Sequence, residues 1–273
     1  MIYLNGSWIA DDEAKISVLD LSVLRGFGIF DYLRTYGKKP FMLDSHIDRF
    51  FNSAHLMGME PVLTKAEIAD IVLQGIEKSA FAQTNIKFIQ TGGVSPDGFT
   101  PSEKQSFFVY FYEFHDFPKE QYTQGTAHRT SRVMRQLPEA KTINYAASIT
   151  EVVKAQKLGF EDILHTDNVG NIYEGTRCNF YGIKNDTLIT ANKGILEGIT
   201  RKVIFEIVKE LGIEIDFRFV TTAELPELDE AFTSNSSHEI VPTVRIDSTS
   251  IGDGVVGPLT IRFMEEFRKR TLN

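Results

Sequence analysis

The chain has very little cysteine, and its single residue of that type, Cys178, cannot form an intramolecular disulfide. One cysteine also cannot build a cysteine zinc site, so we expect no metal centre of that kind and a reducing, cytoplasmic compartment. Long apolar runs are absent as well, and the first residues show no basic start followed by an apolar run. We therefore expect neither a signal peptide nor a membrane-spanning helix.

Positive charge is in deficit, because the formal net charge of the 273 residues is −8. A nucleic-acid partner is therefore not expected, since phosphate backbones are bound by basic surfaces. The hydrophobic content of 42% and the charged content of 24% are ordinary for a globular protein with one large core or two medium ones. If the ligand is anionic, the arginines and lysines that bind it must be concentrated locally.

The pattern of apolar residues predicts an α/β protein in which short strands and helices mix without strict alternation. We expect a small N-terminal α/β domain over residues 1–113 and a large C-terminal domain over residues 125–273. The segment 114–124 contains Pro118 and mixed charge, so it is the predicted linker between the two domains.

Local signals predict where several elements begin and end. Thr64-Lys-Ala-Glu67 has the pattern of a capping box, and Asp44 or Ser45 and Asn144 are the predicted N-caps of two further helices. Residues 21–42 are predicted to begin with a turn, which leads into a strand that ends at Tyr36 and its hairpin partner. Two other helices are predicted over 200–211 and from about 258. Strands are predicted at 2–4, 7–9, up to Tyr36, 39–42, 86–91, 106–113, 126–133, 161–166, 171–174, 178–184, 187–190, 213–219, 229–233 and 240–245.

Lys141 is the residue on which the functional interpretation is built. It lies in Leu137-Pro-Glu-Ala-Lys141, an extended segment that contains a proline and is followed by the predicted helix start at Asn144. The neutral amine of a lysine attacks aldehydes, and burial or nearby cations lower a lysine's pKa toward that form. We interpret Lys141 as the residue that holds a cofactor as a Schiff base, against the alternative of a solvated loop lysine.

Three downstream motifs follow Lys141 in a fixed order: Glu174-Gly-Thr-Arg-Cys-Asn179, Gly198-Ile-Thr-Arg201 and Ser234-Asn-Ser-Ser-His-Glu239. Together with the lysine segment, they resemble the class IV aminotransferases, the fold-type IV enzymes that depend on pyridoxal phosphate (PLP). The resemblance runs from about residue 20 to the C-terminus. It implies two domains, each a mixed sheet or pseudo-barrel with helices, with the cofactor bound mainly by the larger one.

The resemblance also implies roles for individual residues around PLP. Lys141 would bind the cofactor and shuttle a proton during catalysis, and Glu174 would face the pyridine nitrogen. Arg49, which stands in a family-like His-x-x-Arg pattern after His46, would reach the phosphate. The further cofactor residues that the resemblance implies are Ile199, Thr200, Ser236, Ser237 and Tyr145. A helix N-terminus such as that after Gly198 is a ready anion site, although Thr200 could equally be a simple N-cap.

The substrate site departs from the pattern of well-known D-amino-acid transaminases. Those enzymes carry an arginine and a histidine after a Ser-Pro, and this chain has Asp97 and Phe99 at these positions. We expect Arg25 to bind the substrate carboxylate instead, because a guanidinium group suits bidentate carboxylate binding. Lys87 and Arg34 are weaker candidates for the same role. Phe30 is the predicted wall of the pocket.

The predicted function is transfer of an amino group between a D-amino acid, such as D-alanine or D-glutamate, and a 2-oxo acid. Lys141-Thr-Ile-Asn144 is closer in spacing to D-amino-acid transaminases and aminodeoxychorismate lyase than to branched-chain enzymes. A branched-chain L-amino-acid aminotransferase, the lyase and an (R)-amine transaminase remain alternatives, as does a non-catalytic scaffold that keeps the fold. The resemblance further implies a homodimer, with the 92–100 loop and the Arg25 turn near its interface.

Overall fold

The computed structural model describes residues 1–271, and the chain forms two compact units. The N-terminal unit consists of Met1–His115 together with Glu139–Asn144, and the C-terminal unit consists of Asp116–Pro138 and the chain from Tyr145 onward. The short segment Glu139–Asn144 therefore packs with the N-terminal unit, although the sequence places it in the predicted C-terminal domain. None of the helices in residues 1–271 combines the length and the apolar character that crossing a bilayer requires.

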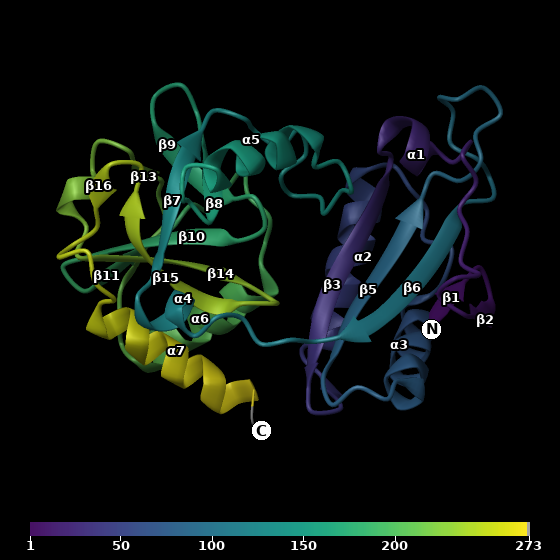
Figure 1. Cartoon of the computed structure of the whole chain (residues 1–273), viewed down its shortest axis with the longest axis horizontal. Coiled ribbons are helices and arrows are strands. Elements are labelled where there is room, and N and C mark those ends of the chain that lie inside the picture. The colour runs from purple at the N-terminus through teal and green to yellow at the C-terminus, as the bar shows by residue number, and fades with distance from the viewer. Residues whose placement is uncertain (272–273) are drawn as a thin grey trace. The chain divides into compact units, whose positions relative to one another are not determined.

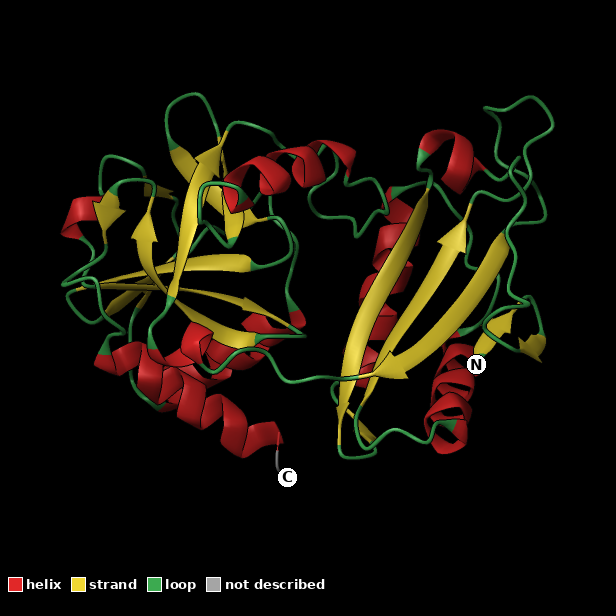
Figure 2. Cartoon of the chain, in the orientation of Figure 1, coloured by secondary structure: helices red, strands yellow, loops and turns green. Residues whose placement is uncertain are grey.

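The N-terminal unit is an antiparallel sheet with helices on one face (Figures 1 and 2). Its strands lie in the order β2-β1-β6-β5-β3-β4. They are β1 (Ile2–Leu4), β2 (Ser7–Ile9), β3 (Gly28–Tyr36), β4 (Lys39–Pro40), β5 (Thr84–Thr91) and β6 (Ser106–Glu113). Its helices are α1 (Leu21–Arg25), α2 (Leu43–Leu56) and α3 (Lys65–Lys78).

Helices α2 and α3 cover the same face of this sheet because each has one apolar stripe. Ile47 and Phe50 of α2 and Ile68 of α3 share a single core with buried residues of the strands, such as Leu33. The ring of Phe50 meets that of Phe88 edge to face at 5.1 Å. Strand residues alternate between this core and the opposite face, so every second residue of β3 and β5 points away from the helices.

The C-terminal unit is built on a larger mixed sheet that closes on itself, because β9 pairs with β10 in addition to the linear strand order. The order is β12-β11-β10-β14-β15-β7-β8-β9-β13, and β16 pairs with β15. The first five strands along the chain are β7 (Thr126–Ser131), β8 (Asp162–Thr166), β9 (Asn171–Gly175), β10 (Asn179–Lys184) and β11 (Thr187–Ile189). The others are β12 (Ile215–Asp216), β13 (Val220–Thr221), β14 (Glu230–Asn235), β15 (Glu239–Ile246) and β16 (Thr249–Ser250). The expected two-domain α/β fold is confirmed.

Four α-helices and one short 3₁₀ helix accompany this barrel-like sheet in the described residues. They are α4 (Glu120–Thr123), α5 (Ala146–Gln156), α6 (Ile199–Glu210), η1 (Leu225–Glu227) and α7 (Pro258–Thr271). Helices α6 and α7 lie against β14, where the ring of Phe232 packs on Phe263 at 5.6 Å. The apolar stripe of α6, which includes Val203 and Ile207, is buried.

The predicted helix starts were partly wrong. The capping box of Thr64 and Glu67 is present, with both reciprocal hydrogen bonds formed. Helix α2, however, begins at Leu43, and its N-cap is Met42 in a left-handed conformation without a side-chain cap. Helix α5 begins at Ala146, after Tyr145 rather than at Asn144. Neither N-cap makes a side-chain capping hydrogen bond, so local polar residues do not reveal these two starts.

Two other predictions need correction. Residues 21–25 form helix α1 rather than part of a turn, because the Asp20 carboxylate caps the Ser22 N–H and Gly26 ends the helix with φ at 66°. Such a positive φ is easily reached only by glycine. The predicted strand over 213–219 shrinks to β12, Ile215–Asp216.

Candidate active site

Lys141 is held by its backbone at the edge of β3 in the N-terminal unit. The Phe30 N–H donates to the Lys141 carbonyl at 2.9 Å, and the Ile143 N–H donates to the Gly28 carbonyl at 3.0 Å. The Lys141 N–H donates to Ser53 Oγ of α2 at 3.0 Å, and this hydroxyl donates in turn to a backbone carbonyl of α2. The lysine segment thus docks as an additional short strand whose buried polar groups are paired.

The side chain of Lys141 lies over an aromatic ring. Its Nζ is 4.5 Å from the centroid of Phe30, and the Nζ of Lys87 is 4.9 Å from the same centroid. Lys87 is paired across the sheet with Tyr32 and Tyr110, and its Nζ lies 5.7 Å from the Tyr110 ring. The structure therefore brings together three residues that the sequence singled out, Lys141, Phe30 and Lys87, on the sheet face opposite α2 and α3.

Arg34 lies on the same face of β3 but is packed farther along the strand. Its guanidinium carbon is 3.6 Å from the centroid of Phe114 and 4.3 Å from that of Tyr36, and Nη2 donates to Gln83 at 3.3 Å. Two rings and an amide thus hold Arg34. Phe30 is four positions earlier in the same strand, so one residue on this face, Tyr32, separates it from Arg34.

Arg49 belongs to a buried charged cluster that links α2 to β3. Its Nε and Nη2 donate to the two carboxylate oxygens of Asp31 at 2.9 and 2.7 Å, and His46 Nδ1 contacts the same carboxylate at 2.7 Å. Burial alone would raise the pKa of Asp31, but Arg49 and His46 hold it well below its usual range. Burial lowers the pKa of His46, and Asp31 opposes that shift. The cluster fixes the direction of the Arg49 guanidinium group.

Arg25 ends helix α1 with an exposed side chain whose Nη1 donates to the Leu24 carbonyl at 2.8 Å. Near it, the 92–100 loop is fastened by Asp97, which accepts hydrogen bonds from the Phe99 and Thr100 N–H groups and from the Thr100 hydroxyl. The Thr100 and Phe99 bonds hold the pKa of Asp97 well below its usual range. Asp97 is therefore a loop-fastening residue, and its negative charge is compensated locally.

Glu174 is the centre of a second cluster, within the C-terminal unit. Its Oε1 accepts from Arg135 Nη1 at 2.9 Å, and its Oε2 accepts from the Leu196 N–H at 3.0 Å. Asn179, which lies directly opposite Glu174 in the β9–β10 pairing, donates to the Leu196 carbonyl at 2.8 Å. Ser234 of β14 lies opposite Asn179 in turn. The side chains of these opposed strand residues share one face of the sheet.

Helix α6 begins beside this cluster. Gly198 is its N-cap, without a side-chain hydrogen bond, and the N–H groups of Ile199 and Thr200 open the first turn. The first N–H groups of a helix have no partner within the helix, so they attract anions. A Cβ on Gly198 would meet Asn179 Oδ1 at 2.1 Å, so the close approach of α6 to Asn179 requires glycine.

The remaining predicted cofactor residues lie in the same unit. Ser236 and Ser237 occupy the turn between β14 and β15, where the Ser237 N–H and hydroxyl both donate to the Asn235 side chain at 3.0 Å. Tyr145 precedes α5, and its ring centroid is 5.8 Å from the guanidinium carbon of Arg135. Tyr145 is thereby connected through Arg135 to Glu174.

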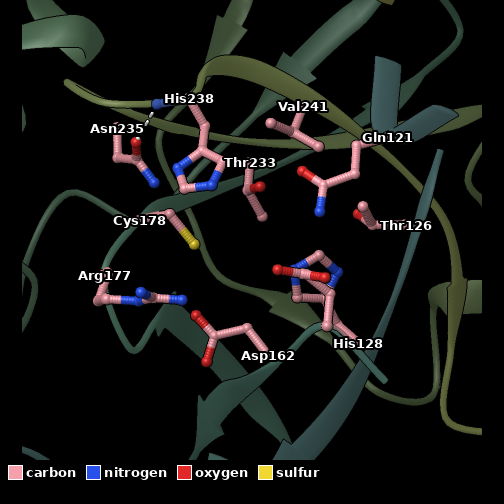
Figure 3. A pocket seen from close by; sticks show the side chains of 11 residues that line it. Gln121, Thr126, His128, Asp162, Arg177, Cys178, Thr233, Asn235, His238 and Val241 are labelled. Atoms are coloured by element: carbon pink, nitrogen blue, oxygen red, sulfur yellow. Dashed lines mark hydrogen bonds between the residues drawn. The ribbon is translucent and has the colours of Figure 1, made fainter. Parts of the chain in front are cut away.

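A small pocket with polar side chains in its lining is formed on the face of β14 that points away from the Glu174 cluster (Figure 3). Thr233, which lines it, alternates along β14 with Ser234, so the pocket and the Glu174 cluster lie on opposite faces. Burial lowers the pKa of His128 to about 4 and raises the pKa of Asp162 and of Cys178. The volume of about 30 Å³ suits one or two water molecules and is too small for an organic cofactor.

Sequence reasoning missed three residues that organise these clusters: Asp31, Ser53 and Arg135. Asp31 could have been noticed, because it is an acidic residue at a core-facing position of a strand and His46 and Arg49 share a helix face. Ser53 and Arg135 carry no such local signal, since their partners are distant in the sequence. Within residues 1–271, no group of three or more His, Cys, Asp or Glu side chains is arranged to hold a metal ion.

Comparison with known proteins decides the family. The family model described as amino-transferase class IV matches residues 28–246. The chain belongs to the class IV aminotransferases. Enzymes of this family use pyridoxal phosphate, and this chain is accordingly a PLP-dependent transaminase.

Similar proteins include enzymes of two specificities. A putative branched-chain-amino-acid aminotransferase of Methanocaldococcus jannaschii is 32% identical, with 98% of this chain and 95% of that protein covered. A D-alanine aminotransferase of Staphylococcus haemolyticus is 31% identical, with coverages of 98% and 96%. The branched-chain amino acid aminotransferase of Escherichia coli superimposes with a TM-score of 0.92 at 26% identity, covering 98% of this chain and 93% of the other. The branched-chain aminotransferase of Thermoproteus uzoniensis with norvaline gives a TM-score of 0.88, also at 26% identity, with coverages of 99% and 94%.

Proposed function

We propose that this class IV aminotransferase moves an amino group between a D-amino acid, such as D-alanine or D-glutamate, and a 2-oxo acid, with Lys141 as its catalytic lysine. The observation that carries the role of Lys141 is its fixed backbone. Hydrogen bonds to Ser53 and Phe30 hold the residue at the β3 edge. A catalytic amine must be positioned closely, because small displacements at a reacting group are costly.

The residues of the chain fit pyridoxal phosphate by their chemistry. The ring nitrogen needs an acid, which the buried Glu174 carboxylate supplies, and the phosphate needs donors, which the Ile199 and Thr200 N–H groups at the start of α6 supply. Gly198 leaves this helix end uncovered by a side chain. When bound, the cofactor supplies an aldehyde carbon that accepts the amino group and an electron-withdrawing ring. The neutral Lys141 amine would accept the proton from the substrate α-carbon on its Nζ.

Other residues complete the proposed cofactor site. Ser236 and Ser237 supply donors to the phosphate from the β14–β15 turn, and Arg49 supplies a cation whose direction Asp31 fixes. Tyr145 is proposed to lie near the ring hydroxyl of the cofactor. Each of these groups binds or orients the cofactor and leaves the proton transfer to Lys141.

The D-amino-acid specificity is supported by two observations. The Lys141-Thr-Ile-Asn144 spacing resembles that of D-amino-acid transaminases, and curated D-alanine aminotransferases are about as similar to this chain as the branched-chain relative is. A branched-chain L-amino-acid aminotransferase is the second candidate, favoured by the M. jannaschii relative and by the E. coli and T. uzoniensis structures. Substrate chirality separates the two candidates.

Arg25 is the proposed carboxylate-binding residue. Its exposed position at the end of α1 leaves the guanidinium group within reach of a ligand, whereas Arg34 is already packed between two rings. Asp97 is engaged by its own loop and takes no part in substrate binding in this proposal. Phe30 and Lys87 form the pocket wall, where the Lys87 amine offers a second cation for an acidic substrate side chain.

A homodimer is proposed from the apolar residues of the same region. Val23 and Phe99 are 60% and 78% exposed, and Leu19 and Val94 are 54% and 48% exposed. The Ser95 N–H donates to the Leu19 carbonyl, so the loop lies beside the segment that leads into α1. Contiguous exposed apolar surface commonly marks a protein–protein contact.

The test of specificity compares half-reactions with D-alanine, D-glutamate and L-leucine in wild type and in Arg25→Ala. We expect turnover of the D-amino acids and a loss of about tenfold to a hundredfold in kcat/KM for Arg25→Ala, the range for a charged hydrogen bond. Lys104→Ala, at an exposed lysine close to Gly93, is the matched control and should change little. Turnover of L-leucine alone would replace this proposal by the branched-chain candidate.

A further inference from the structure

Arg135 connects the two features on which the proposed chemistry depends. Its Nη1 donates both to Glu174 Oε1 at 2.9 Å and to the Pro138 carbonyl at 3.0 Å. Pro138 ends the part of the C-terminal unit that leads directly into the segment of Lys141. The Arg135 guanidinium group therefore binds both Glu174, the proposed partner of the ring nitrogen, and the backbone of Pro138, three residues before Lys141.

The contact is buried, and this makes the charge of Arg135 effective. The side chains of Arg135 and Glu174 are only 7% and 5% exposed. An isolated carboxylate so deeply buried favours its neutral form, and a cation at hydrogen-bond distance favours the ionised form. The guanidinium group of arginine is a cation, so Arg135 supplies a counter-charge to the Glu174 carboxylate.

The surroundings hold Arg135 in this position. His165 of β8 contacts the Val133 carbonyl through Nδ1, and the Val133 N–H donates to the Ser131 hydroxyl at 3.3 Å. Residues that precede Arg135 are thereby fixed to the barrel. On the far side, Glu174 is fixed by the Leu196 N–H. The ion pair joins two anchored segments rather than two loose side chains.

The position of the cation determines where a shared proton resides. When Glu174 faces a pyridine nitrogen, one proton can sit on the carboxylate or on the ring. A cation in contact with the carboxylate stabilises its ionised form and so drives the proton to the ring, where it is needed for electron withdrawal. Without that cation, a buried pair favours two neutral partners.

We propose that Arg135 is a positioning residue that keeps Glu174 ionised and oriented, so that the proton resides on the cofactor ring nitrogen, and that it ties this acid to the chain leading to Lys141. The inference rests on the proposed role of Glu174. It assigns to Arg135 an electrostatic function that acts through Glu174, without contact to the substrate.

The test uses the full-length enzyme loaded with PLP that is isotope-labelled at the ring nitrogen. The nitrogen NMR shift reports directly whether the ring is protonated. We expect a protonated ring in wild type, an unprotonated ring in Glu174→Gln, and a shift toward the unprotonated signal in Arg135→Gln. We also expect kcat to fall about tenfold to a hundredfold in Arg135→Gln, with a smaller change in KM.

Two further variants separate charge from architecture. Arg135→Lys restores the cation but not the planar fork, so it should keep the protonated signal while kcat falls about threefold to tenfold. Arg132→Gln removes an exposed arginine of the same segment and should match wild type in both measurements. If Arg135→Gln does not fold, Arg135→Lys decides, because an unprotonated ring in that variant, which keeps the cation, would contradict the electrostatic role.

The outcomes distinguish this inference from the proposed function. A ring that stays fully protonated in Arg135→Gln, but not in Glu174→Gln, would overturn the role of Arg135 and leave that of Glu174 intact. A ring unaffected by Glu174→Gln would instead overturn the proposed role of Glu174, and with it the inference. Loss of ring protonation in both variants, with recovery in Arg135→Lys, is the expected result.

Discussion

Replacing Ser53 by alanine should loosen the docking of Lys141. The Ser53 hydroxyl is fully buried, accepts from the Lys141 N–H at 3.0 Å and donates to the Arg49 carbonyl at 2.9 Å. Alanine keeps the helix but leaves a partly buried N–H without its partner. Leaving such a donor unsatisfied costs about 1–3 kcal/mol.

The magnitude can be measured at one amide. If the lost hydrogen bond is local, hydrogen exchange at the Lys141 N–H should accelerate by about fivefold to a hundredfold, because each 1.4 kcal/mol is a factor of ten. If the amine is displaced together with its backbone, kcat should fall by about tenfold, since the reacting group is no longer held in place. Exchange at amides in β14 should stay unchanged.

The control is Ser148→Ala, which removes a buried serine hydroxyl from helix α5 in the other unit. It should affect neither the Lys141 amide nor kcat beyond about twofold. Wild-type exchange at Lys141 in Ser53→Ala would refute the reasoning that this hydroxyl fixes the lysine. Local exchange is preferred to a global unfolding curve, because a chain of two units need not unfold in one step.

Further predictions concern the C-terminal unit. Burial lowers the pKa of His128 and His165 from 6.5 to about 4, so both are neutral when folded at pH 7. The unfolded chain takes up protons below about pH 6.5, so the free energy of unfolding should fall as pH drops toward 4, by about 3 kcal/mol per histidine. His165→Asn should flatten this dependence in denaturant titrations, and an unchanged slope would contradict the assignment. Gly198→Ala should weaken PLP binding about tenfold or more, because the new Cβ would lie 2.1 Å from Asn179 Oδ1. Adding Asn179→Ser to this variant should recover part of the lost affinity. Equal PLP dissociation constants for wild type and Gly198→Ala would show that α6 accommodates the methyl group.

Elements specified by neighbouring residues could be predicted from the sequence. The Thr64 capping box and the apolar stripe of α6 are local patterns, and both are found. The starts of α2 and α5 were misplaced because Met42 and Tyr145 serve as N-caps without any side-chain cap. Helix α1 was missed because it has only five residues, too few to show an apolar period. Its only local signals are the N-cap Asp20 and the C-cap Gly26.

The same distinction holds for the candidate site. Glu174, Gly198 and Lys141 stand in motifs that are recognisable as a set along the chain. The pairing of Arg135 with Glu174 spans 39 positions, and that of Ser53 with Lys141 spans 88. No periodicity or spacing rule reaches across such distances, so the groups that hold the motif residues became visible only with the fold.

The most direct test of the central claim is the visible absorption spectrum of the purified protein loaded with PLP. The spectrum is recorded for wild type and for Lys141→Ala, before and after separate additions of D-alanine, D-glutamate and L-leucine. We predict a yellow band in wild type that bleaches with the D-amino acids, and neither that band nor turnover in a folded Lys141→Ala protein. Wild-type turnover in Lys141→Ala would contradict the catalytic role of this lysine. Bleaching by L-leucine alone would leave that role in place and contradict the proposed specificity.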